Sequence, residues 1–220
     1  MSGWLDPILN PITKVVFVVG DDHVTWAELF GLIFGVICIA LAVRAMLLNY
    51  PVGILSAVMF ALLFYWARLW ADTGLQLMFI TLGFVGWYQW IRGKRPQTPL
   101  LIRPSSPLFL AGGVLLTAVL TAGLTPILGA ADDSSPFLDS LTTSLSVTGQ
   151  LLLNIKRIEN WWFWVAASVI YFPLYLSRHL LLTAWVDVLV FVLYCAGYLE
   201  WRRRLTRSRT PAASVGLAPV

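Results

Sequence analysis

The side chains with the most evident chemistry are amides and indole rings in the second half of the chain. Gln150 and Asn154 are four residues apart, so on a helix both amides lie on one face. Trp161 and Trp164 follow at a helical spacing of three. Amides form several hydrogen bonds with a polar ligand, and indole rings stack on flat rings and attract cations. The combination is suited to a flat heteroaromatic ligand, particularly a cationic one.

Other polar and aromatic residues share these faces. Asp187 lies within an apolar run, where a carboxylate is costly unless it binds a ligand or a partner helix. Two roles therefore stay open for it, a wall of the binding site together with Tyr194, and a structural hydrogen bond to another helix. The candidate binding residues are Gln76, Gln150, Asn154, Trp161, Trp164, Ser168, Tyr171, Asp187 and Tyr194.

Catalytic and metal-binding patterns are missing from the sequence. His23 and His179 are the only histidines, and Cys38 and Cys195, the only cysteines, lie in apolar runs. There is no metal-ligand cluster, no nucleophile with a plausible histidine base and no glycine-rich phosphate loop. We therefore expect no enzyme activity, no metal, no cofactor and no built-in ATP motor.

Composition decides which elements carry these side chains. Of the 220 residues, 59% are hydrophobic and 12% are charged, whereas a soluble domain has about 25% charged residues. So few charges cannot cover a surface in water, which excludes soluble enzymes, disordered chains and nucleic-acid-binding domains. The apolar runs are continuous rather than alternating, so they predict membrane helices.

Seven runs are long enough to span a bilayer, at 26–46, 51–70, 74–91, 108–130, 137–156, 161–178 and 181–201. Breaks between them contain proline, glycine or polar residues, and an extended crossover is expected at 92–107. Residues 8–19 are too few to span, so an amphipathic helix in the membrane interface is expected there. No cleaved signal peptide is recognised at the N-terminus.

The positive charge follows the topology. With seven spans, twelve lysines and arginines fall on one side of the membrane and three on the other. The first side is therefore cytoplasmic, with the N-terminus outside and the C-terminus inside. The basic run 202–209 anchors the last span against anionic lipid, and no nucleic-acid partner is needed to explain it.

An internal repeat relates the two halves of the chain. A shift of 111 residues superimposes the first three spans on the last three, with Asn49 on Asn160 and Trp90 on Trp201. The expected fold is an all-α membrane protein with two parallel three-helix repeats joined by one linker helix, the 3+1+3 architecture of SWEET-type sugar facilitators. The expected divisions are an interfacial segment 1–25, a first repeat 26–92, a crossover and linker helix 93–136, a second repeat 137–203 and a basic tail 204–220.

The chain resembles the PnuC family of bacterial vitamin transporters. The resemblance is carried by Thr148-Gly149-Gln150, Asn154, Glu159-Asn160-Trp161-x-x-Trp164, Gly197 and Trp201, and it covers about 26–203. It implies facilitated uptake of nicotinamide riboside across the inner membrane, trapping by an intracellular kinase, and a homotrimer. Relatives of that family carry thiamine or riboflavin.

The residues leave several functions open. Nicotinamide riboside and thiamine both carry a ring cation, so an aromatic cage suits either, and the ribose hydroxyls favour nicotinamide riboside in an amide-rich site. A membrane scaffold with no solute is a second class. A seven-helix receptor is a third, although a retinal receptor needs a lysine in its last span and 181–201 has none.

Overall fold

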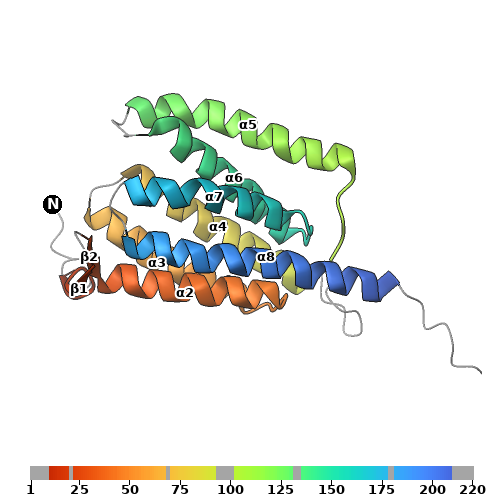
Figure 1. The fold of residues 1–220 in the computed structure, drawn as a ribbon, viewed down its shortest axis with the longest axis horizontal. Helices are drawn as coiled ribbons and strands as arrows, with labels where there is room; N and C mark the ends of the chain where they lie inside the picture. The colour runs from red at the N-terminus through yellow and green to blue at the C-terminus, as the bar shows by residue number, and fades with distance from the viewer. Residues whose placement is uncertain are drawn as a thin grey trace, which may run out of the picture.

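Long helices occupy all seven predicted places in the structure, a computed structural model that describes residues 10–19, 22–67, 70–92, 102–130, 135–177 and 181–209 (Figure 1). Predictions for the other residues, including the break at 178–180 and the tail beyond 209, lie outside the described residues. The helices are α2 (Trp26–Val43), α3 (Asn49–Trp66), α4 (Trp70–Arg92), α5 (Pro107–Ala130), α6 (Pro136–Asn154), α7 (Asn160–Ser177) and α8 (Leu181–Arg209).

The helix predicted at 8–19 is wrong for residues 15–19, whereas residues 10–12 are helical. Residues 15–19 form a strand, β1 (Val15–Val19), which pairs antiparallel with β2 (Asp22–Thr25). The run Val15-Val16-Phe17-Val18-Val19 consists of β-branched and aromatic residues, which favour a strand. Thr25 then caps α2, because its hydroxyl accepts a hydrogen bond from the backbone N–H of Glu28.

Several predicted boundaries also move. Helix α3 begins at Asn49, before Pro51, since a proline in the first turn lacks only an N–H that has no helical partner there. Helix α8 continues to Arg209, eight residues beyond the predicted end of its span at Trp201. The crossover is partly described: Arg103 pairs with the turn between α6 and α7 by accepting from Ile158 N–H and donating to the Lys156 carbonyl.

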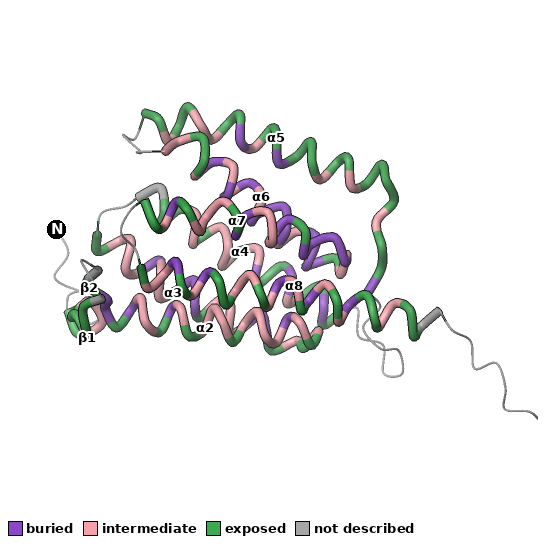
Figure 2. Tube along the Cα trace, viewed as in Figure 1, coloured by how far each residue is buried: buried purple, intermediate pink, exposed green. Residues whose placement is uncertain are grey.

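The helices pack as two groups of three. Helices α2, α3 and α4 contact one another in sequence, as do α6, α7 and α8, while α5 packs on α6. The groups meet through α2 against α8 and α4 against α6. Since the repeat relates α2 to α6 and α4 to α8, these two contacts are equivalent. Figure 1 shows α5 at the edge of the bundle, and Figure 2 shows that it is largely exposed. It therefore joins the groups without standing between them.

The 111-residue repeat is visible in the hydrogen bonds. Nε1 of Trp90 donates to the Leu153 and Asn154 carbonyls at the end of α6. Nε1 of Trp201 donates to the Ala42 and Val43 carbonyls at the end of α2. Donors and acceptors in the two sets are each 111 residues apart, so the two halves make the same hydrogen bonds to each other at this point.

Four of the described helices, α2, α3, α5 and α8, are long and apolar enough to cross a membrane. Helices α4, α6 and α7 are less apolar. In α6, which carries most of the hydroxyl residues, Ser140, Ser144 and Thr148 are buried against other helices rather than facing lipid. Apolarity averaged along a helix therefore understates how well α6 fits inside a membrane bundle.

Candidate substrate cavity

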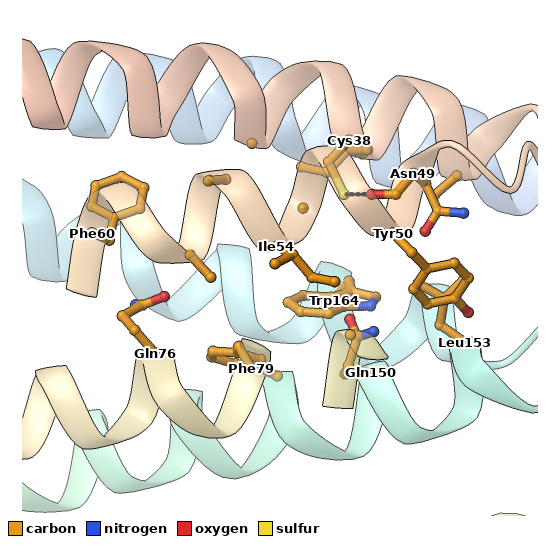
Figure 3. A pocket seen from close by; sticks show the side chains of 18 of the residues that line it. Cys38, Asn49, Tyr50, Ile54, Phe60, Gln76, Phe79, Gln150, Leu153 and Trp164 are labelled. Atoms are coloured by element: carbon orange, nitrogen blue, oxygen red, sulfur yellow. Dashed lines mark hydrogen bonds between the residues drawn. The ribbon is translucent and has the colours of Figure 1, made fainter. Parts of the chain in front are cut away.

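A cavity of about 320 Å³ lies between the two groups of helices and is lined by residues from α2, α3, α4, α6, α7 and α8 (Figure 3). This volume is at the small end of the range for small-molecule sites. Among the described residues that line it, none is charged. Aromatic rings and amides dominate, so the cavity favours a small ring system with a few polar groups.

The lining follows the repeat. Many lining residues have a mate 111 positions later that also lines the cavity: Gly35 with Ser146, Ile39 with Gln150, Ala42 with Leu153, Tyr50 with Trp161, Gly53 with Trp164, Phe60 with Tyr171, and Gly83 with Tyr194. The cavity therefore lies where the two repeats face each other. In two of these pairs the second repeat has an aromatic ring where the first has glycine, so the cavity is chemically asymmetric.

Trp164 supplies the largest ring beside the Gln150 amide. Its indole stacks on Tyr194, with ring centroids 5.6 Å apart and an interplanar angle of 27°. A Cβ atom at Gly149 would lie 3.0 Å from Nε1 of Trp164, so the glycine lets the indole lie close against α6. Figure 3 shows Trp164 and Gln150 among the side chains that line the cavity.

The two predicted amides have different roles. Gln150 lines the cavity, and its Nε2 donates to Oδ1 of Asn154 at 3.0 Å. Asn154 is buried, and its Nδ2 donates to the Leu82 carbonyl of α4 at 2.9 Å. Asn154 thus ties α6 to α4 and orients Gln150, and it does not itself line the cavity.

Ser168 and Asp187 also lie outside the lining. The Ser168 hydroxyl donates to Oδ2 of Asp187 at 2.9 Å, and both residues are buried where α7 packs on α8. This is the structural hydrogen bond considered for Asp187. The repeat mate of Asp187, Gln76, does line the cavity.

These observations describe a duplicated bundle around an uncharged aromatic cavity, and the comparison with known families decides its kind. A family model described as "Nicotinamide mononucleotide transporter" matches residues 25–203. The chain belongs to this family. It is therefore a multi-pass membrane protein of a vitamin transporter family, and not an enzyme.

Curated members of the family are distant in sequence. The nicotinamide riboside transporter PnuC of Escherichia coli (strain K12) is 27% identical over 189 residues, which cover 74% of this chain and 79% of that protein. The riboflavin/roseoflavin transporter RibM of Streptomyces davaonensis is 25% identical over 207 residues, covering 92% and 97%. Both kinds of relative match, so family membership leaves the substrate open.

A solved structure in the family has the same fold. The crystal structure of the vitamin B3 transporter PnuC matches with a TM-score of 0.71 over 93% of this chain and 91% of that one, at 22% identity. The all-α bundle expected from the sequence is therefore a known fold of the nicotinamide mononucleotide transporter family.

Of the nine predicted binding residues, the structure brings six to the cavity: Gln76, Gln150, Trp161, Trp164, Tyr171 and Tyr194. The lining also includes Tyr50 and Phe79, which sequence reasoning missed, and Tyr175, which follows Tyr171 at helical spacing but was not among the candidates. A signal for Tyr50 was present, because it is the repeat mate of Trp161. Applying the 111-residue shift to each candidate would have identified it.

Proposed function

We propose that this member of the nicotinamide mononucleotide transporter family mediates facilitated uptake of nicotinamide riboside, with phosphorylation inside the cell as the trap. Seven membrane spans, an external N-terminus and a cytoplasmic C-terminus are part of the proposal. The homotrimer implied by the family resemblance stays a prediction.

The observation that carries the proposal is the stack of Trp164 on Tyr194 beside the Gln150 amide, in a cavity whose described lining has no charge. Nicotinamide riboside has a flat pyridinium cation, a carboxamide and a ribose. The cation gains by contact with indole and phenol faces when no lysine or arginine competes. Gln150 and Gln76 provide hydrogen bonds for the carboxamide and the ribose hydroxyls.

Riboflavin is the second candidate, and the similarity to RibM over 92% of the chain favours it. Its isoalloxazine ring is flat but neutral and wider than a pyridinium. Stacking would still contribute to its binding, whereas cation–π attraction would not. Thiamine, which has a smaller cationic ring, is the third candidate.

A titration of the purified protein with nicotinamide riboside, thiamine and riboflavin tests the proposal. We expect nicotinamide riboside to bind most tightly. Tighter binding of riboflavin would assign the chain to the riboflavin carriers. If none of the three binds, the result would favour a membrane scaffold that carries no solute.

The mode of transport is tested in liposomes that contain the protein and no kinase. The sequence has no nucleotide-binding motif, so we expect the solute to reach equal concentrations inside and outside and then to stop. Accumulation above that level in a proton or sodium gradient would contradict facilitated transport.

A further inference from the structure

One end of the cavity is closed by buried residues, whereas lining residues at the other end are partly exposed. Tyr50 and Trp161 line it at the end where α3 and α7 begin, and only 2% and 1% of their surfaces are exposed. Ala42 and Leu153 line the same end and are buried too. At the opposite end, the lining residues Phe60, Gln76, Tyr171 and Tyr175 are all partly exposed.

The closed end is the basic end of the bundle. Ala42 is followed by Arg44, and Leu153 is followed by Lys156 and Arg157. By the charge asymmetry between the two faces, this end belongs in the cytoplasm. With the proposed topology, the cavity is therefore blocked on its cytoplasmic side.

The blocking residues come in repeat-related pairs, each backed by a tryptophan. The ring of Tyr50 meets Trp90 edge to face, at 5.1 Å and 79°. The ring of Trp161 meets Trp201 in the same way, at 5.5 Å and 88°. Trp90 and Trp201 are fully buried, and together with the blocking residues they belong to one apolar cluster.

The two tryptophans also connect the groups of helices. Trp90 belongs to the group α2–α4 and donates to the end of α6, at 3.0 Å from the Asn154 carbonyl. Trp201 belongs to the group α6–α8 and donates to the end of α2, at 3.2 Å from the Ala42 carbonyl. If the groups part at this end, both hydrogen bonds break, and entering water must replace them.

We infer that Ala42, Tyr50, Leu153 and Trp161 form the cytoplasmic gate of the transport pathway, and that Trp90 and Trp201 are positioning residues that hold this gate closed. The inference rests on the proposed transport function. It predicts that the gate opens by separation of the two groups of helices at their cytoplasmic ends, with both indole N–H groups released together.

The chain supplies a reporter for the gate. Cys38 lines the cavity near the closed end, and its thiol donates to the Asn49 carbonyl at 3.2 Å (Figure 3). In a Cys195→Ser background, the rate at which a small charged methanethiosulfonate modifies Cys38 is measured from each side of oriented membrane vesicles. We expect the wild-type gate to make the cytoplasmic-side rate the slower one.

Trp90→Phe and Trp201→Phe keep a ring and remove the N–H group. Each should raise the cytoplasmic-side rate about three- to tenfold, the effect of losing one buried hydrogen bond from the closed state. Gly197→Ala should also raise the cytoplasmic-side rate, because its Cβ would lie 2.6 Å from the Trp161 indole and would push this gate residue out of position. Trp162→Phe, at an exposed position next to Trp161, is the matched control and should change neither rate.

Thermal unfolding of each variant separates opening of the gate from general loss of structure, which would raise the rates from both sides. Unchanged cytoplasmic-side rates in both tryptophan variants, at wild-type folded yield, would overturn the inference. So would a wild-type Cys38 that reacts equally from both sides or from neither. The assay uses no vitamin, so its outcome does not depend on which vitamin binds. Failure of all three vitamins to bind would contradict the proposed function but would not change the measured Cys38 rates.

Discussion

Ala45 and Lys156 both adopt a left-handed backbone conformation, with φ of 52° and 61°, and they are 111 residues apart. Each follows the last turn of the first helix of its repeat. The N–H of Ala45 donates to the Ala42 carbonyl, and that of Lys156 to the Leu153 carbonyl. These are the helix-ending bonds of a Schellman motif, a position usually occupied by glycine. Each repeat therefore turns sharply into its second helix at an energetic cost.

Replacing Ala45 with glycine should stabilise the protein. Glycine adopts this conformation without the steric cost that a Cβ brings, and the expected gain is up to about 1 kcal/mol. Thermal unfolding in detergent measures it. Ala42→Gly is the control, because Ala42 lies within α2, where glycine should destabilise. A lower melting temperature for Ala45→Gly would show that the left-handed turn is not formed.

Trp164→Ala should weaken vitamin binding about five- to thirtyfold, the effect of one aromatic face on a cation in a desolvated pocket. Trp164→Phe should weaken it less, because a smaller aromatic face remains. Trp162→Ala should have little effect, since Trp162 is exposed on the outer surface of α7. If Trp162→Ala abolishes binding and Trp164→Ala does not, the proposed face of α7 is wrong.

Gln150 and Asn154 should differ when each is replaced by alanine. Gln150→Ala removes a cavity amide and should weaken binding with little change in stability. Asn154→Ala removes the side-chain hydrogen bond that ties α6 to the Leu82 carbonyl of α4 and should cost about 1 kcal/mol of stability. Binding isotherms and unfolding curves for both variants separate the two roles, and equal losses of stability would argue against the division.

Asp187 should act on stability rather than on binding. Ser168→Ala removes the hydrogen bond to the buried carboxyl group and should lower the melting temperature. Asp187→Asn retains an acceptor oxygen for Ser168 and should be milder. Vitamin affinity should change by no more than about twofold in both variants. If Asp187 bonded the vitamin directly, loss of that hydrogen bond would weaken binding by more than this. A larger loss of affinity at wild-type stability would place Asp187 in the binding site.

A reporter fused after Val220 should behave as cytoplasmic, because the charge asymmetry predicts that the basic ends of the helices lie inside the cell. The matched control is a fusion before Met1, which should behave as external. Labelling of the C-terminus from outside the cell would mean that one span has been miscounted.

The sequence by itself determined the helices, their order and the repeat. The length of an apolar run and the breaks at its ends can be read from consecutive residues. They predict helices because a backbone inside a membrane must satisfy its own hydrogen bonds. The repeat pairs Trp90 with Trp201 in the sequence alone. The strands β1 and β2 were missed because a short apolar run is compatible with helix and strand, and the pairing between β1 and β2 decides between them.

Only the tertiary structure decided which polar side chains reach the cavity. Helical spacing places Asp187 and Tyr194 on one face, yet Tyr194 lines the cavity and Asp187 bonds Ser168. The rotation of each helix about its axis is set by close contacts between helices, such as Gly197 against the Trp161 indole and Gly149 against Trp164. These contacts join residues far apart in the chain, and no local pattern in the sequence contains them.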